Sequence, residues 1–285
     1  MRTKELHAAP RLAPLYAKAI LPSRRGETLP DTEYVRPDIT FDPAHLAAYN
    51  QVCGFRFTGE LPVTYPHLLA FGLQLALMTQ PDFPFPLLGM VHVANRITQH
   101  RPVRLDETVS IRVRAENLRP HEKGHQFDVL SELSTADGVM WTEVSTYLRR
   151  ASGTGSSGKQ LAAPSPKAIW RVPRDIGRRY AEVSGDRNPI HLHPLTAKLF
   201  GFPAAIAHGM WTKARTLAAF EGRLPDAYTV DVRFKLPVLL PAKVAFTSWE
   251  TPDGWAFELW NARKPLPHLG GTVSSVARSR PREDR

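Results

Sequence analysis

Strict alternation of apolar and polar residues marks two segments of this chain as β-strands with one buried face. In residues 228–236, Tyr, Val, Val, Phe and Leu alternate with Thr, Asp, Arg and Lys, and residues 109–114 alternate in the same way. Two other segments, residues 67–78 and 210–222, predict helices. The first is apolar on all sides, as expected for a helix enclosed by a sheet, and the second has one apolar face from which Lys213 is excluded.

These elements recur in the same order in two parts of the chain. The segments YNQVCG (residues 49–54) and YAEVSG (residues 180–185) each end a helical stretch with a glycine suited to the position after a helix. In both parts a central helix and several strand-like segments follow. The pattern predicts an α+β protein built from two tandem copies of one unit.

A segment rich in Gly, Ser and Pro separates the two copies. Residues 151–166 read ASGTGSSGKQLAAPSP and have no hydrophobic period, which is typical of a linker. The predicted domains are therefore residues 1–150 and residues 167–285. Part of the linker, GTGSSGK, is similar to a phosphate-binding P-loop. However, Gln160 stands where a P-loop needs Ser or Thr, and two prolines prevent the helix that must follow. No nucleotide site is predicted there.

The two copies differ in length after their shared glycine. The first runs 13 residues from Gly54 to the histidine of its central helix, whereas the second runs 23 residues from Gly185 to its own. Phe55 in the first copy stands where the second has Asp186. The sequence therefore predicts that the C-terminal domain carries chemistry and that the N-terminal domain does not.

A carboxylate and an imidazole lie five residues apart in the segment SGDRNPIH, residues 184–191. Asp186 follows the end of a predicted helix, and the Asn188-Pro189 turn brings His191 back toward it. Eighteen residues after His191, Gly209 opens the next helix. An acid/base pair beside a helix N-terminus is suited to proton transfer next to a carbonyl group. Spacing alone leaves another interpretation open, in which Asp186 only stabilises a turn and His191 is an ordinary polar surface residue.

Other chemistries at this segment have weaker support. His191 and His193 with Asp186 offer metal ligands, but Pro194 ends the extended segment and no third His or Cys follows at ligand spacing. Ser184 is not surrounded by the Gly-x-Ser-x-Gly sequence that is typical of a nucleophilic serine. We therefore predict no metal, and a supporting role for Ser184.

Composition sets broad limits. The 285 residues, with 42% hydrophobic and 22% charged residues, are typical of a globular protein. A single cysteine excludes an internal disulfide and predicts a cytoplasmic location. The first 30 residues lack the apolar core of a secretory signal, and the longest apolar run is shorter than the ~20 residues that span a bilayer, so we expect neither a signal nor a membrane span.

The net charge of +10 predicts attraction to polyanions such as nucleic acid, the phosphates of a cofactor or an acidic carrier protein. No basic helix with interleaved aromatic residues and no zinc-knuckle spacing occurs, so nucleic acid is not an expected partner. The net charge does not distinguish between cofactor phosphates and an acidic carrier protein as the partner.

The motif over residues 180–210 resembles the hydratase-2 motif of MaoC-like proteins. The matching residues are Tyr180, Ser184-Gly185-Asp186, Asn188-Pro189-Ile190-His191, Ala197, Phe200-Gly201 and Ile206-Ala207-His208-Gly209-Met210. The resemblance implies a tandem, or double, hot-dog fold, in which each half is an antiparallel sheet wrapped around a central helix. Over about residues 30–275 the chain is similar to the double-hot-dog 3-hydroxyacyl-thioester dehydratases of actinobacterial fatty-acid metabolism.

The resemblance also implies an activity and the residues that perform it. Asp186 and His191 are the expected acid/base pair for reversible, (R)-specific hydration of trans-2-enoyl thioesters, and Gly209 is the expected oxyanion-hole donor. Asn188 is expected to orient the site, whereas His208 is expected to be structural. No cofactor is expected, because CoA or the pantetheine of an acyl carrier protein is part of the substrate. The shortened N-terminal domain is expected to accommodate the acyl chain.

Two other functions stay open at this point. The first is hydrolysis of the thioester on the same fold, with a carboxylate directing water at the carbonyl carbon. The second is a subunit that binds acyl thioesters without catalysis. The tandem halves predict a monomeric pseudo-dimer or a homodimer.

Overall fold

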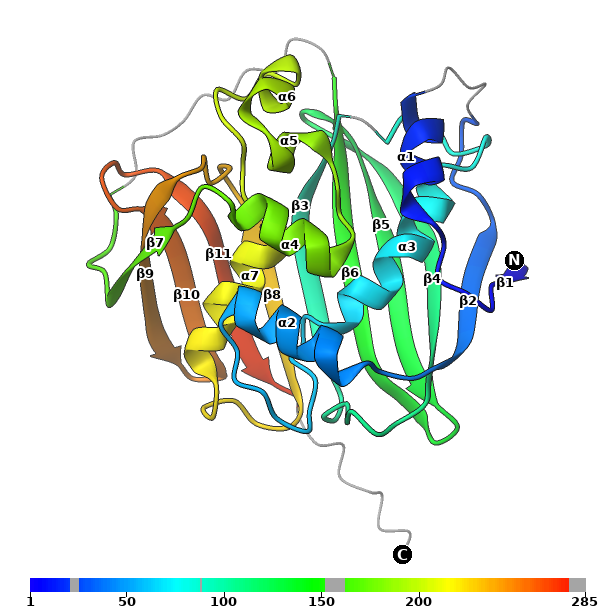
Figure 1. Cartoon of the computed structure of the whole chain (residues 1–285), viewed down its shortest axis with the longest axis horizontal. Coiled ribbons are helices and arrows are strands. Elements are labelled where there is room, and N and C mark those ends of the chain that lie inside the picture. The colour runs from blue at the N-terminus through cyan, green and yellow to red at the C-terminus, as the bar shows by residue number, and fades with distance from the viewer. Residues whose placement is uncertain (21–25, 88, 152–161, 277–285) are drawn as a thin grey trace, which may run out of the picture.

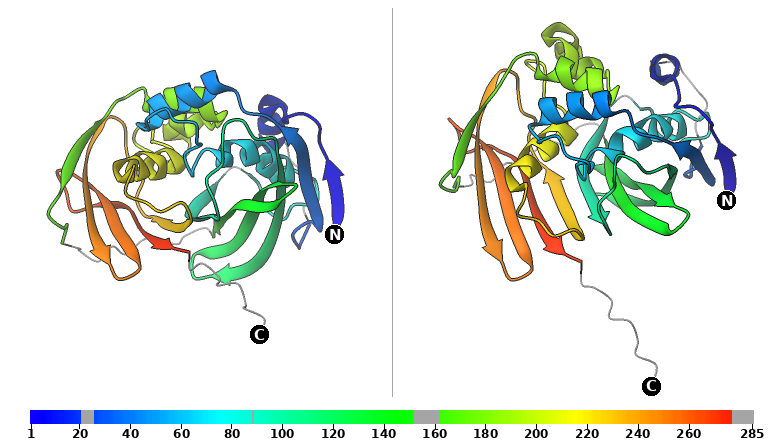
Figure 2. Two further views of the ribbon diagram at one scale, coloured as in Figure 1. Left: turned by 90° about the horizontal axis from the view of Figure 1, so that it is seen from below. Right: turned by 60° about the horizontal axis from the view of Figure 1, so that its bottom comes forward.

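One sheet of 11 strands forms the frame of the protein, and the helices lie on its concave face (Figures 1 and 2). The computed structural model describes residues 1–20, 26–87, 89–151 and 162–276. The P-loop-like segment and most of the predicted linker therefore lie outside the described residues. The strand order is β1-β2-β4-β5-β6-β3-β8-β11-β10-β9-β7. The strands are β1 (Arg2–Glu5), β2 (Thr32–Ile39), β3 (Met90–Gln99), β4 (Val109–His121), β5 (Gly124–Thr135), β6 (Gly138–Arg150), β7 (Ala168–Val172), β8 (Tyr228–Phe234), β9 (Ala242–Thr251), β10 (Gly254–Asn261) and β11 (Pro267–Ser275).

The helices form two sets, one in each part of the chain. The first set comprises α1 (Leu12–Ile20), α2 (Pro43–Cys53) and α3 (Pro66–Met78). The second comprises α4 (Ile176–Ser184), α5 (Pro189–Leu192), α6 (Pro194–Leu199) and α7 (Gly209–Leu217), which a 3-10 turn, η1 (Ala218–Phe220), extends. No helix in the described part of the chain is both long and apolar enough to cross a membrane.

Strands β3 and β8 join the two parts into one sheet. They pair antiparallel from Ala94 opposite Arg233 to Gln99 opposite Tyr228. Strands from residues 2–150 lie on one side of this junction, and strands from residues 168–275 lie on the other. The two copies read from the sequence are therefore hydrogen-bonded edge to edge.

The predicted strands bury the face that their alternation indicates. Val109, Ile111 and Val113 of β4 are buried, as are Val230 and Val232 of β8. The prediction for residues 228–236 extends too far by two positions. Strand β8 ends at Phe234 and Leu236 is exposed, because the backbone beyond it runs along β11 without regular pairing.

Lys213 differs most from the sequence prediction. It was placed outside the apolar face of its helix, yet its side chain is fully buried. Because α7 lies between the sheet and the helices above it, no side of this helix faces solvent along its length (Figure 2). The Lys213 ammonium nitrogen donates to Asn95 Oδ1 at 2.5 Å, to the Asn95 carbonyl at 3.1 Å and to the Val230 carbonyl at 3.5 Å. It therefore holds α7 to both strands of the junction.

A chain of buried polar groups continues from Asn95 into the first half. The Asn95 side-chain amide donates to Glu143 Oε1 at 2.7 Å, and the same oxygen lies 2.7 Å from His67 Nδ1. Burial raises the pKa of Glu143, but His67 and the amide favour the carboxylate more strongly, so the net pKa lies below its ordinary value. This network connects α7, β3, β6 and α3 through hydrogen-bonded side chains. These hydrogen bonds compensate the free-energy cost of removing the polar groups from water.

We predict that Lys213 makes stability depend on pH on the alkaline side of neutrality. Burial lowers its pKa from 10.5 to about 7, so between these values the unfolded chain binds a proton that the folded chain does not. Stability therefore rises with pH from about 7 to 10.5, by up to about 5 kcal/mol. Denaturant unfolding of Lys213→Met should lack this rise, whereas Lys167→Met, at an exposed lysine, should retain it. Parallel pH profiles for Lys213→Met and the wild type would contradict the prediction.

Candidate active site

Asp186 lies directly after the C-terminus of α4. Gly185 ends the helix with φ +73°, the left-handed conformation that glycine adopts without strain. The Asp186 main-chain N–H then donates to Ser184 Oγ at 3.1 Å, and the Asn188 N–H donates to Asp186 Oδ1 at 3.1 Å. The two predicted supporting residues, Ser184 and Asn188, thus lie in the turn that carries Asp186.

His191 is part of the short helix α5, which begins after this turn. Asn188 caps the helix by accepting a hydrogen bond from the Ile190 N–H at 3.4 Å. The His191 side chain is buried, and its Nδ1 lies 2.9 Å from the Ile206 carbonyl oxygen. Because a carbonyl oxygen only accepts hydrogen bonds, Nδ1 carries the proton and the neutral ring has its lone pair on Nε2.

His208 completes the cluster, although the sequence analysis assigned it a structural role. Its ring stacks on that of His191, with centroids 3.7 Å apart. Its Nε2 donates to the Asp186 main-chain oxygen at 3.0 Å and lies 3.7 Å from Asp186 Oδ2. Its Nδ1 is buried and has no hydrogen-bond partner among the described residues. The one sequence signal for His208 is its position directly before Gly209 in the motif.

Asp186, His191 and His208 offer one donor atom each within 4.8 Å of one another, a geometry that could hold a metal ion. The sequence argument against a metal was that no third histidine or cysteine followed at ligand spacing, and His208 supplies that third group. Each imidazole uses one nitrogen to bond a main-chain oxygen, which fixes the direction of the other nitrogen. That the site works without a metal stays a prediction.

Burial and mutual contact set the protonation states of these groups. Burial raises the pKa of Asp186, but His208 and His191 act against it, as do the two hydrogen bonds to Oδ1. The net pKa of Asp186 lies below its ordinary value. Burial lowers the pKa of His191, with Asp186 opposing the shift. Burial, and then repulsion from His191, lowers the pKa of His208 to about 3. At neutral pH the cluster therefore holds an ionised carboxylate and two neutral imidazoles.

Gly209 is the first residue of α7, and His208 is its N-cap. An amide in the first turn of a helix has no acceptor within the helix, and the helix dipole adds partial positive charge there. Because Gly209 directly follows His208, this N-terminus lies beside the cluster. The ring of Phe234 lies against it, since a Cβ at Gly209 would come within 3.2 Å of Phe234 Cε1.

Tyr16 is a site residue that the sequence analysis missed. It belongs to α1, and its hydroxyl donates to Asp186 Oδ1 at 2.7 Å. Since 170 residues separate the two side chains, no local pattern connects them. Burial, and then the charge of Asp186, raises the pKa of the Tyr16 phenol far above its ordinary value, so the hydroxyl keeps its proton.

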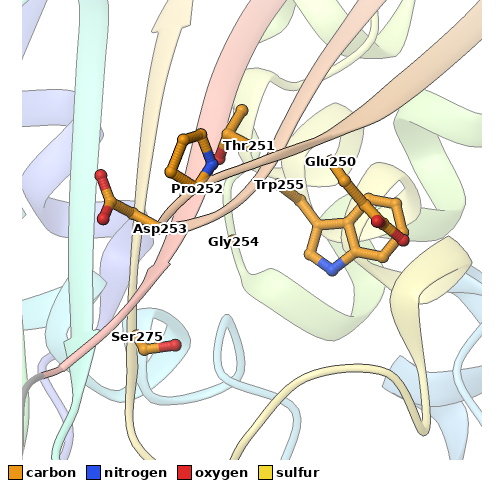
Figure 3. A pocket seen from close by; sticks show the side chains of 7 residues that line it. All are labelled: Glu250, Thr251, Pro252, Asp253, Gly254, Trp255 and Ser275. Atoms are coloured by element: carbon orange, nitrogen blue, oxygen red, sulfur yellow. The ribbon is translucent and has the colours of Figure 1, made fainter.

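A hollow at the hairpin between β9 and β10 is a separate feature (Figure 3). Its lining runs from Glu250 to Trp255 with Ser275 of β11, and it contains none of the predicted site residues. It lies at the end of the sheet strands of the second half, where the side chains around Gly254 leave an open concavity (Figure 3). The acid/base cluster is therefore the candidate active site.

Comparison with known proteins places this chain in a family. The profile of the family described as "MaoC like domain" matches residues 158–261. The chain is 44% identical to 3-hydroxyacyl-thioester dehydratase X of Mycobacterium tuberculosis over 258 residues, which cover 88% of this chain and 92% of that protein. It is 29% identical to the enoyl-CoA hydratase ChsH3 of the same organism over 224 residues, 71% and 77% of the two chains.

Solved structures give the same result for the fold. The crystal structure of HtdX of M. tuberculosis superposes with a TM-score of 0.78 at 43% identity and covers 86% of this chain and 100% of that one. A MaoC-like dehydratase of Phytophthora capsici, 19% identical, shares the fold with a TM-score of 0.71 and covers 87% and 96%. The predicted tandem hot-dog fold is confirmed, and the chain belongs to the family of MaoC-like dehydratases.

Proposed function

We propose that this protein is a hydro-lyase that adds water to trans-2-enoyl thioesters and, in reverse, removes it from (R)-3-hydroxyacyl thioesters. The observation that carries the proposal is the proximity of three features. These are the ionised Asp186, the neutral His191 and the helix N-terminus that begins at Gly209. Membership of the MaoC-like family supports the same reaction in fatty-acid metabolism.

The protonation states suit the activation of water. His191 presents an unprotonated Nε2, because its Nδ1 donates to the Ile206 carbonyl. Asp186 Oδ1 accepts two hydrogen bonds, from Tyr16 and from the Asn188 amide, while Oδ2 faces His208 at 3.7 Å. Both groups are bases at neutral pH, and a water molecule bound between them would lose a proton to one of them.

The hydration step then balances without any further reactant. The water oxygen forms a bond to C3 as its proton passes to Asp186 or His191, and the C2–C3 π electrons move to the thioester carbonyl. The resulting enolate takes a proton at C2 from the acid just formed, which returns the site to its starting state. Dehydration follows the same steps in reverse. No metal or redox cofactor takes part, because the thioester itself acidifies the C2 proton.

Gly209 is proposed to stabilise the enolate. Its amide, at the N-terminus of α7, would donate to the carbonyl oxygen on which negative charge develops. Removing one such donor from an enzyme costs about 3–4 kcal/mol of transition-state stabilisation. This interaction strengthens as charge develops, so it favours the transition state over the bound substrate.

The two halves have different proposed roles. The C-terminal half, residues 167–285, supplies the acid/base pair and the oxyanion donor, whereas the N-terminal half, residues 1–150, accommodates the acyl chain. Residues 151–166 would link them. Tyr16 and Asn95 of the first half contact Asp186 and Lys213 of the second, which supports one chain acting as a pseudo-dimer. Further pairing into a homodimer is compatible with this arrangement.

The acyl group is proposed to arrive on CoA or on an acyl carrier protein. The net charge of +10 suits the phosphates of CoA and an acidic carrier equally well. The single cysteine, Cys53, is a buried free thiol, and a cytoplasmic place of action fits this usage.

The proposal predicts that both members of the pair are needed for hydration. Asp186→Asn and His191→Ala should each lower kcat by about 10²–10⁴-fold, because each removes a proton-transfer group. Loss of the conjugated enoyl absorbance of trans-2-enoyl-CoA measures the rate. Asp175→Asn is the matched control and should keep the wild-type rate, because Asp175 is the N-cap residue of α4 and its side chain makes no cap hydrogen bond. Release of free thiol without loss of the enoyl group would instead indicate a thioesterase.

The protonation states also predict the pH profile of hydration. His191 must be unprotonated, and burial lowers its pKa below the ordinary value of 6.5. The pKa of Asp186 is lowered as well. We therefore expect kcat/KM to stay constant from pH 8 down to about 6.5 and to fall only on the acid side of that value. A value of kcat/KM that already declines between pH 8 and 7 would contradict the lowered pKa of His191 as the base.

A further inference from the structure

Helix α1 contacts the candidate active site at two points, and the segment before it contacts α3. Its Tyr16 hydroxyl donates to Asp186 Oδ1 at 2.7 Å. Leu12, at its start, packs on the backbone where α4 ends, since a Cβ at Gly185 would come within 2.6 Å of Leu12 Cδ1. Pro10, just before the helix, packs on α3, where a Cβ at Gly72 would come within 3.2 Å of Pro10 Cδ.

These contacts fix the position of Tyr16 relative to Asp186. The two glycines leave room for the N-terminal segment to approach α3 and α4 closely, and α1 lies against the upper end of α3 (Figure 1). Leu12 touches the residue directly before Asp186, so the segment that carries the phenol and the turn that carries the carboxylate are packed together. The hydrogen bond therefore joins two rigidly placed groups.

We propose that Tyr16 is a positioning residue for hydration, which holds the Asp186 carboxylate in the orientation that the reaction needs. This inference rests on the proposed function. With Tyr16 and the Asn188 amide both bound to Oδ1, rotation of the carboxylate would break two hydrogen bonds. The other oxygen, Oδ2, is thereby directed to the side of the histidines, 3.7 Å from His208 Nε2. Tyr16 acts through Asp186 and transfers no proton itself.

The exposure of Asp186 and the pKa shifts of both residues agree with Tyr16 acting as a hydrogen-bond donor to Asp186. The Asp186 side chain is 24% exposed, so a small reactant can reach it, and without fixed donors it could turn toward solvent. The hydroxyl of Tyr16 lowers the pKa of Asp186, together with the two imidazoles and the Asn188 amide. Burial and the carboxylate raise the pKa of Tyr16 itself, so the phenol donates its proton to this bond over the whole working pH range.

Replacement of Tyr16 by Phe tests the proposal, because it removes the hydroxyl and keeps the ring. We expect kcat for hydration of trans-2-enoyl-CoA to fall about 10–100-fold with KM changed less than about threefold, a loss typical of groups that orient a reacting residue. The acid limb of the pH profile should move to higher pH, since the carboxylate loses a donor. Tyr49→Phe is the matched control. It also loses a buried hydroxyl bond, 2.8 Å to Thr64 Oγ1, and should keep the wild-type kcat and pH profile.

Two kinetic outcomes would overturn the proposal. An unchanged kcat and acid limb in Tyr16→Phe would show that the hydrogen bond does not position Asp186. An increased kcat would show that the phenol obstructs the site.

A second measurement separates this proposal from the hydratase function. The ¹³C carboxyl signal of Asp186, identified by its absence in Asp186→Asn, reports the titration of the carboxylate in protein labelled at aspartate. We expect its midpoint to rise in Tyr16→Phe and not in Tyr49→Phe. If the wild type hydrates no enoyl thioester, the function fails while a raised midpoint still supports the role of Tyr16. An unmoved midpoint would overturn that role whatever the activity.

Discussion

A partly buried, ionised carboxylate is the constraint around which the site is arranged. A charge removed from water is stable only where donors and opposite charge replace its hydration. Asp186 receives the Tyr16 hydroxyl and the Asn188 amide on one oxygen, and two imidazoles lie beside it. The carboxylate, the His191 ring and the phenol are each held in place by another part of the chain. The left-handed Gly185 places the carboxylate, the Ile206 carbonyl fixes the His191 tautomer, and α1 carries the phenol.

The same constraint explains why the site needs both halves of the chain. Asp186, His191 and His208 all come from the second half, but the phenol that binds Asp186 comes from the first. A second buried network leads from Lys213 of α7 to Asn95 and Glu143 in the first half. Because β3 and β8 pair directly, the elements that make these contacts share one continuous sheet as their support. The first half of the chain thus contributes hydrogen-bonding groups to the surroundings of Asp186 and Lys213 in the second.

The fold and the centre of the site were largely predictable, because their signals are local. Period-two alternation located β4 and β8, and the glycine after each copied helix revealed the repeat. The Asp186 to His191 turn was predictable because the Asn-Pro sequence reverses the chain within five residues. The motif also placed Gly209 at the start of a helix, where it is found.

The remaining residues could not be predicted, because their roles depend on contacts between distant segments. Tyr16 meets Asp186 across 170 residues, and Lys213 meets Asn95 across 118. Lys213 was expected to avoid the buried face, since helical periodicity says nothing about a helix enclosed on every side. The stacking of the His208 ring on that of His191 likewise appears only in the folded chain.

The stereochemical course of hydration in D2O tests whether one cluster around Asp186 and His191 makes both transfers. The side-chain oxygen of Asp186 and ring nitrogen of His191 lie within 4.8 Å of each other in one cluster. If these two groups make both transfers, as proposed, the water oxygen and the C2 deuteron are added to the same face of the double bond. NMR of the 3-hydroxyacyl product should therefore show a single diastereomer, that of syn addition, with the (R) configuration at C3. Addition to opposite faces, or a mixture of diastereomers formed by the enzyme, would contradict a mechanism in which this one cluster makes both transfers.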